Sequence, residues 1–209
     1  MRIPSPNVSE VTMLPIVEEF YTIQGEGHYS GHAAYFIRIG GCDVGCPWCD
    51  TMVSWDSARH PLKPVDELIV NAADCPASFA VITGGEPLMY NLDYLCQGLN
   101  DAGIETALET SGAYPLSGRW DWICLSPKIH KAPLKEIFQY ANELKIVIAE
   151  EKDLEWAFEN AILVNPTCKL YLQPEWSVFR TILPVLVEFV KRNPQWNISL
   201  QTHKFMRIP

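Results

Sequence analysis

The sequence has little positive charge and no long hydrophobic run. Its 209 residues carry 16 Lys and Arg against 25 Asp and Glu, a formal net charge of −9. Nucleic acids and anionic membranes bind basic surfaces, so we expect neither as a partner. No segment approaches the run of about 18 apolar residues that a transmembrane helix needs. Residues 1–10 have no apolar core, so we expect no signal peptide and a cytoplasmic protein.

The composition is that of a folded, single-domain protein. Hydrophobic residues make up 48% of the chain, enough for a packed core, and the length fits one domain over residues 1–209. Segments rich in β-branched and aromatic residues alternate with segments of helical periodicity, which predicts an α/β fold with a largely parallel sheet. Strands are expected at 15–23, 34–39, 79–83, 104–109, 121–126, 144–149, 170–173 and 198–201, and helices at 92–102, 135–142, 153–160 and 178–191. The stretch 51–65 is the least regular.

Three of the seven cysteines, Cys42, Cys46 and Cys49, form the pattern C-x3-C-x2-C directly after the strand expected at 34–39. Crowded thiols in a chain with an odd number of cysteines favour a metal site in a reducing compartment over disulfides. Iron–sulfur clusters usually take four thiolates, so three would leave one iron open to another ligand. A zinc site would need a fourth ligand, for which His60 is the nearest candidate. The remaining cysteines are expected in the core: Cys75, Cys96, Cys124 and Cys168.

A glycine-rich turn, Thr83-Gly84-Gly85-Glu86-Pro87, follows the apolar strand expected at 79–83. Two glycines at a strand end let a ligand approach the backbone closely, and Glu86 offers an acceptor for an ammonium group. Taken alone, the same residues also fit an ordinary strand-to-helix turn. Other strands end in polar residues too, which predicts a shared pocket at the carboxyl ends of the strands. These ends are Glu109-Thr110-Ser111-Gly112, Ser126-Pro127-Lys128 and Gln173-Pro174-Glu175-Trp176.

Four further residues near the strand ends suit a small polar ligand. Gln24 and Glu26 lie in the turn after the first expected strand and offer donors and acceptors to a heterocycle, although composition alone slightly favours an ordinary solvent-exposed turn. Arg38 lies in an apolar strand, where its burial is costly without an anion. Its partner is either the carboxylate of a ligand or an internal Asp or Glu. Thr51, just after the last cysteine of the loop, offers one oxygen to a magnesium ion.

The cysteine pattern, with Trp48 before its third cysteine, and the turn TGGEP together resemble the radical S-adenosylmethionine (SAM) superfamily. In that superfamily SAM binds the open iron of a 4Fe–4S cluster, and the reduced cluster cleaves it to a 5′-deoxyadenosyl radical. The longer set of motifs IQGEG, FIR, CxWCDT, SPK, LQPEW and QTHK resembles the 7-carboxy-7-deazaguanine synthase family of queuosine and deazapurine biosynthesis, over nearly the whole chain. The alternatives are a glycyl-radical-enzyme activase within the superfamily and a non-catalytic iron–sulfur or zinc-binding module outside it.

The resemblance implies an incomplete (β/α) barrel, a homodimer and a C-terminal segment that closes the active site. It implies a lyase that converts 6-carboxy-5,6,7,8-tetrahydropterin to 7-carboxy-7-deazaguanine with loss of ammonia. The cofactors would be a 4Fe–4S cluster, SAM and Mg²⁺, and a flavodoxin or ferredoxin would donate the electron. The SAM-derived radical would carry out the chemistry, so no catalytic residue is expected on the protein itself.

The resemblance also implies a role for each matching residue. Cys42, Cys46 and Cys49 would hold the cluster, and Thr51 would bind magnesium. The pterin site would comprise Ile23, Gln24, Gly25, Arg38, Thr83 and the C-terminal Pro209, with Arg38 on the pterin carboxylate. The SAM site would comprise Trp48, Cys49, Asp50, Gly85, Ser126, Pro127, Lys128 and Gln173. Gln201 and His203 are further candidates in the closing segment, for which a frayed chain end is the alternative.

Overall fold

In residues 12–209, which the computed structural model describes, nine β-strands form one open sheet. The expectation of no signal peptide in residues 1–10 lies outside the described residues. The strand order is β3-β1-β2-β4-β5-β6-β7-β8-β9. Every neighbouring pair from β2 to β9 is parallel, whereas β1 runs antiparallel to both β2 and β3. The expected α/β fold with a largely parallel sheet, of the incomplete-barrel type, is confirmed.

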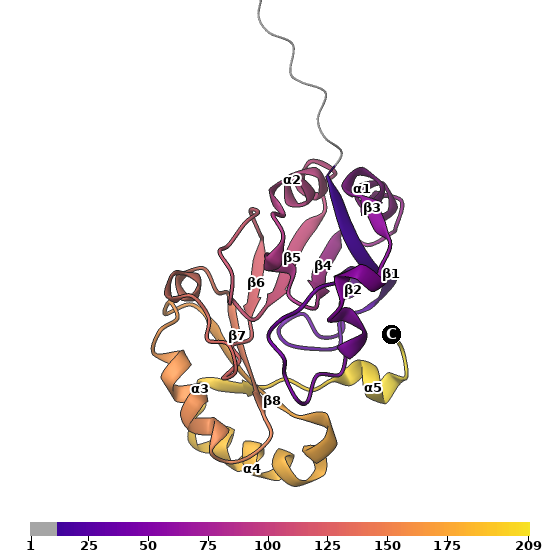
Figure 1. Cartoon of the computed structure of the whole chain (residues 1–209). Helices are drawn as coiled ribbons and strands as arrows, with labels where there is room; N and C mark the ends of the chain where they lie inside the picture. The colour runs from indigo at the N-terminus through magenta and orange to yellow at the C-terminus, as the bar shows by residue number, and fades with distance from the viewer. Residues whose placement is uncertain (1–11) are drawn as a thin grey trace, which may run out of the picture.

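Helices pack against the sheet at both of its ends (Figure 1). Figure 1 shows α1 and α2 near β1 to β5, and α3 and α4 near β7 and β8. None of the helices in residues 12–209 has both the length and the apolar character to cross a membrane. The strands are β1 (Met13–Ile23), β2 (Ala33–Ile39), β3 (Leu62–Pro64), β4 (Phe79–Gly84), β5 (Glu105–Thr110), β6 (Trp122–Leu125), β7 (Glu143–Ile148), β8 (Lys169–Pro174) and β9 (Trp196–Ile198). The α-helices are α1 (Val65–Ala73), α2 (Asp93–Asp101), α3 (Asp153–Ala161), α4 (Phe179–Arg192) and α5 (Thr202–Met206).

Alternation along the strands separates the core from a polar interior. In β7 the side chains of Leu144, Ile146 and Ile148 are buried in the main hydrophobic core. Burying one such side chain contributes about 1.5–3 kcal/mol to folding. Because successive strand residues face opposite sides of a sheet, Lys145 and Val147 lie on the other face. The helices therefore cover the apolar face of β7, and its polar residues face the concave side of the sheet.

Two of the expected elements have other bounds or another type in the structure. The helix expected at 135–142 is a short 3-10 helix, Lys135–Gln139, followed by a turn. It ends early because Asn142 pairs with Ile123: the Asn142 N–H donates to the Ile123 carbonyl, and the Ile123 N–H donates to Asn142 Oδ1. The strand expected at 198–201 is β9, which ends at Ile198. The chain then leaves the sheet, and the Thr202 N–H donates to the Gly25 carbonyl.

The stretch expected to be least regular, 51–65, contains structure that the sequence analysis missed. Two 3-10 turns, Met52–Ser54 and Ser57–Arg59, are followed by β3, which pairs with the start of β1. Helix α1 begins at once after Pro64 and was not predicted. Its buried residues Val65, Leu68 and Ala72 recur at helical spacing, and this periodicity is the signal that was available.

Candidate active site

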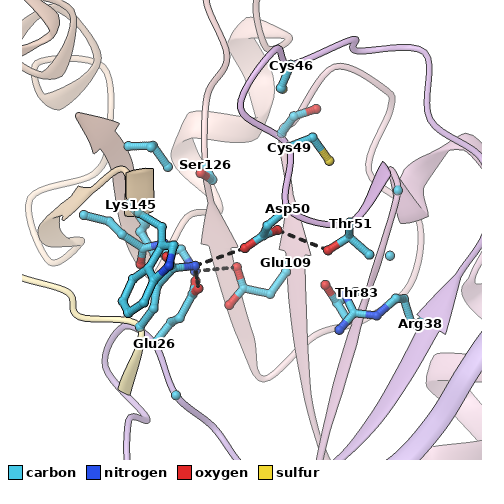
Figure 2. Close-up of a pocket in the computed structure, with 18 of the residues that line it drawn as sticks. Glu26, Arg38, Cys46, Cys49, Asp50, Thr51, Thr83, Glu109, Ser126 and Lys145 are labelled. Carbon is cyan, nitrogen blue, oxygen red and sulfur yellow. Dashed lines mark hydrogen bonds and ion pairs between the residues drawn. The ribbon is translucent and has the colours of Figure 1, made fainter. Parts of the chain in front are cut away.

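A cavity of about 600 Å³ lies at the carboxyl ends of the parallel strands, as the strand-end polar residues predicted (Figure 2). The residues that line it come from β1 and the turn after it, from β2, β4, β5, β7 and β8, from the residues after β6, from the cysteine loop and from the C-terminal segment. Of the residues expected to bind cofactor, substrate or metal, all but one line this cavity. The exception is Pro127, which is buried between Ser126 and Lys128. The role of each residue stays a prediction, but their convergence is a property of the fold.

The glycine turn after β4 packs against the start of the cysteine loop. The Gly85 N–H donates to the Ile39 carbonyl (2.9 Å), and the Glu86 N–H donates to the Gly41 carbonyl (2.8 Å). A Cβ atom on Gly85 would lie 2.2 Å from the Gly41 oxygen, so no other residue fits there without a shift. The protein's own backbone therefore makes one close approach that these glycines permit, and the expected approach of a ligand to the same turn, which lines the cavity, stays a prediction.

Glu86 is a buried carboxylate whose acceptor positions are occupied from within the chain. One of its oxygens accepts from the Leu88 N–H and the Thr110 hydroxyl, and the other accepts from the N–H and the hydroxyl of Ser111. Only 1% of the residue is exposed. In the chain alone, this carboxylate ties the glycine turn to the end of β5. Glu86 also lines the cavity, and its expected contact with a ligand ammonium group stays a prediction.

The three thiols of the cysteine loop share one wall of the cavity. Burial raises the pKa of the Cys42 and Cys46 thiols. The indole N–H of Trp55 donates to Cys49 Sγ at 3.3 Å. All seven cysteines are free, and within residues 12–209 no three His, Cys, Asp or Glu side chains are grouped closely enough to hold a metal ion. The four other cysteines are buried or half-buried and contribute to or pack against the core, as expected.

A lysine between two carboxylates forms another wall. Lys145 Nζ donates to Glu26 Oε2 at 2.8 Å and to Glu109 Oε2 at 2.9 Å, with 5% of the lysine side chain exposed (Figure 2). Burial works to raise the pKa of Glu26, but Lys145 and Gln201 outweigh it and lower that pKa to about 2. The sequence analysis did not select Lys145. The available signal was a lysine within an apolar strand, the same argument that selected Arg38.

Arg38 pairs with an internal carboxylate. Its Nε donates to Glu18 Oε1 at 2.7 Å, and its guanidinium carbon lies 5.9 Å from the centre of the Phe20 ring. Of the two partners considered for Arg38, an internal Glu is therefore present. Among the contacts within residues 12–209, this ion pair uses only Nε, so both terminal amino groups of Arg38 are available to a second anion.

The side chains expected at the SAM site are held by local contacts. Lys128 Nζ donates to the carbonyl and the hydroxyl of Ser126, both at 2.6 Å, and lies 5.5 Å from the centre of the Trp48 indole. Burial lowers the pKa of Lys128. Gln173 Oε1 accepts from the Ser199 hydroxyl at 2.7 Å. The polar groups of this wall are therefore ordered by the chain itself.

The C-terminal segment also lines the cavity. Gln201, His203 and Lys204 contribute to the wall, and so does the last residue, Pro209. Figure 1 shows this segment crossing from β9 to end near the loop that follows β2. Lys204 Nζ donates to Asp50 Oδ2 at 3.0 Å, and Asp50 Oδ1 accepts from the Thr51 hydroxyl at 3.1 Å. Of the two expectations for this segment, a frayed end is excluded by these contacts.

Comparison with known proteins gives strong relatives over almost the full length. The chain is 50% identical to a 7-carboxy-7-deazaguanine synthase from Flavobacterium psychrophilum, over 97% of this chain and 96% of the relative. It is 47% identical to the enzyme of that name from Synechocystis, over 93% of each chain. The crystal structure of QueE from Escherichia coli superposes with a TM-score of 0.78 and 29% identity, over 90% of this chain and 93% of the other. No family model matches the chain.

The open, mostly parallel sheet, the three-cysteine loop at its carboxyl end and these relatives define the class of protein: it is a radical SAM enzyme. Relatives at 31–50% identity, over most of this chain, are named 7-carboxy-7-deazaguanine synthase. The chain belongs to the 7-carboxy-7-deazaguanine synthase family.

Proposed function

We propose that this protein converts 6-carboxy-5,6,7,8-tetrahydropterin to 7-carboxy-7-deazaguanine, with contraction of the ring and release of ammonia. The observation that carries the proposal is that one cavity joins the cysteine loop to Arg38 and to the carboxylates around Lys145. A radical formed at the cysteine loop would thereby share one cavity with groups that suit a carboxylated heterocycle.

Arg38 is the residue that we assign to the substrate carboxylate. Its terminal amino groups are free of the Glu18 contact, and a carboxylate accepts two parallel hydrogen bonds from such a fork. Glu26 and Glu109 line the same cavity and carry acceptors that suit the amino and ring N–H donors of a pterin. The cationic and acidic groups would orient the ligand, with its carboxylate toward Arg38.

Cys42, Cys46 and Cys49 are the residues that would hold a 4Fe–4S cluster. Three thiols in one loop that lines the cavity suit that cluster by donor type, and in the unloaded protein they are not yet grouped closely enough to hold a metal ion. Loading must draw the three side chains together and remove their protons. When bound and reduced, such a cluster supplies the electron that cleaves SAM to a 5′-deoxyadenosyl radical. The chain's own part is to hold SAM against Trp48 and Lys128 and to exclude water.

The remaining components of the proposal are a magnesium ion, an electron donor and a second subunit. Thr51 donates its hydroxyl hydrogen to Asp50, which leaves the lone pairs of Thr51 Oγ1 for Mg²⁺. We propose that a flavodoxin or ferredoxin delivers the electron and that the protein is a homodimer in the cytoplasm.

The test is a single anaerobic incubation. Reconstituted protein is mixed with reductant, SAM, Mg²⁺ and 6-carboxytetrahydropterin, and the products are identified by mass spectrometry. We expect a product lighter than the substrate by one ammonia, with SAM recovered. Formation of 5′-deoxyadenosine alone would refute the substrate assignment. Absence of both products from protein with an intact cluster would favour a non-catalytic iron–sulfur module.

A further inference from the structure

The C-terminal segment connects the cysteine loop to the turn after β1 through side-chain hydrogen bonds. Gln201 Nε2 donates to Glu26 Oε1 at 2.8 Å and to Asp50 Oδ2 at 3.2 Å. Lys204 Nζ donates to the same Asp50 oxygen at 3.0 Å and to Gln201 Oε1 at 2.9 Å. Glu26 lies on the side expected to bind the pterin, whereas Asp50 follows the third cysteine. Gln201 therefore contacts both halves of the cavity, and Lys204 joins Asp50 to Gln201.

Contacts other than those of Lys204 hold the C-terminal segment in place. The N–H and the hydroxyl of Thr202 both donate to the Gly25 carbonyl, at 2.8 and 3.0 Å. A Cβ atom on Gly25 would lie 2.3 Å from His203 Nδ1, so this glycine is what lets the segment pack on the turn. The Phe205 ring packs against Trp176 and Phe179, with centroid distances of 5.4 and 5.5 Å. These contacts anchor the segment on the turn after β1 and on the residues that follow β8, whereas its link to the cysteine loop is made by Lys204 and Gln201.

Lys204 is also more than a solvated surface charge. Its side chain is 20% exposed, its ammonium group donates to two acceptors, and it lies 5.0 Å from the centre of the Trp176 indole. An exposed ion pair contributes little, but an ammonium confined by a ring and two acceptors fixes the position of its partner. The partner here is Asp50, which also accepts from the hydroxyl of Thr51. The position of the cysteine loop is thus tied to that of the C-terminal segment.

We propose that Lys204 is a positioning residue that couples the two ligand subsites, so that SAM bound at the cysteine loop strengthens pterin binding under the C-terminal segment, and the reverse. The inference rests on the proposed function, because it takes SAM and the pterin as the two ligands. When one ligand orders the cysteine loop, the contact between Asp50 and Lys204 also orders the C-terminal segment. The second ligand then binds without having to order that segment itself, so it binds more tightly. Coupling of this kind is reciprocal by thermodynamic necessity.

The experiment measures affinities without turnover. Cluster-reconstituted protein is titrated anaerobically, with no reductant, with 6-carboxytetrahydropterin in the presence and absence of SAM, and then with SAM in the presence and absence of the pterin. We expect each ligand to tighten the other by about tenfold in the unaltered protein. In Lys204→Met that factor should fall severalfold, because only the bond from Gln201 to Asp50 still joins the segment to the loop, while each ligand alone still binds. Lys204→Arg keeps the charge and donors and should keep most of the factor.

A second readout and a control separate coupling from general damage. Hydrogen exchange in residues 199–209 should slow when SAM is added to the unaltered protein but not to Lys204→Met. Lys191→Met removes a lysine from an exposed ion pair with Glu188 and should leave the factor unchanged. If Lys204→Met weakens both ligands with the factor intact, Lys204 is merely structural and the proposal is overturned. Failure of both ligands to bind the unaltered protein would instead refute the proposed function itself.

Discussion

Lys145 holds two carboxylates on one wall of the cavity, whereas the three thiols of the cysteine loop form no group that could hold a metal ion within residues 12–209. We call the first the acid–lysine wall (Glu26, Glu109 and Lys145) and the second the cysteine wall (Cys42, Cys46 and Cys49). Buried charges must be paired as soon as the chain folds, because an unpaired one costs several kcal/mol. Buried thiols whose pKa is raised remain neutral and need no such partner.

The two walls should differ in how much their contribution to stability depends on a bound cofactor. The acid–lysine wall is complete in the chain alone and should contribute to the stability of the protein without any cofactor. The cysteine wall should contribute mainly when its thiols are bound. Substitutions on the two walls should therefore separate stability from activity.

The largest expected effect is that of Cys46→Ala. Loss of one of three thiolates should prevent an intact cluster and abolish both product formation and 5′-deoxyadenosine formation, while the free energy of unfolding of the unloaded protein changes little beyond the loss of one small buried side chain. Iron and acid-labile sulfide analysis, together with chromatography of the nucleoside, checks the first part, and urea unfolding checks the second. Cys75→Ala, outside the loop, is the control and should keep its iron. SAM cleavage that survives in Cys46→Ala would contradict the three-thiolate assignment.

Lys145→Met should have the opposite profile. It leaves two carboxylates facing each other without a cation, so we expect the unloaded protein to lose about 3 kcal/mol of unfolding free energy. Urea unfolding measures this loss. Lys191→Met, which breaks an exposed ion pair whose lysine is 64% exposed, should cost no more than about 0.5 kcal/mol. An equal loss of unfolding free energy in the two variants would show that the acid–lysine wall contributes no more to stability than an exposed ion pair.

The pH dependence of stability tests the same wall more finely. The pKa of Glu26 falls from 4.5 to about 2 on folding, so its stabilising contribution is present above about pH 4.5 and is lost as the pH falls toward 2. In Lys145→Met the main cause of that depression is absent, and the slope of unfolding free energy against pH between those values should flatten. A slope that Lys145→Met leaves unchanged would assign the acid sensitivity to other carboxylates.

Arg38→Ala tests the proposed substrate contact. Loss of a charged, hydrogen-bonded partner should raise the KM for the pterin by about 100-fold, while SAM cleavage uncoupled from product formation continues. Stability should change little, because the abandoned Glu18 is half exposed. Arg59→Ala, which removes an exposed arginine paired with Asp56, is the matched control. Parallel loss of both activities in Arg38→Ala would give Arg38 a structural role in place of a binding one.

The sequence was sufficient to predict the cysteine loop, the glycine turn and the strand ends that form the cavity, because each is a local pattern placed by parallel topology. It was not sufficient to find the partners that cross the fold. Lys145 meets Glu26 across 119 residues of sequence, and Lys204 meets Asp50 across 154. Such pairs depend on how the first and last strands are brought together, and no spacing within one segment encodes them. Glu86 shows the same limit, since its donors belong largely to the next strand.

Thr110→Val tests whether the glycine turn beneath the cysteine wall is held in place in the unloaded protein, although the three thiols themselves are not yet grouped. Valine matches the shape of threonine but removes the hydroxyl that donates to Glu86 Oε1 at 2.6 Å, between two buried side chains. A hydrogen bond to a buried charged group contributes about 1.5–3 kcal/mol, so we expect a loss near 2 kcal/mol in urea unfolding of the unloaded protein. Thr167→Val removes an exposed hydroxyl that donates to Asn165 and should cost far less.

Because Glu86 bonds to Gly41 at the base of the cysteine loop through its backbone N–H, the loosened turn should also lower the fraction of protein that takes up iron. A loss of stability without any change in iron uptake would show that Glu86 stabilises the fold but does not help the cysteine loop to bind the cluster.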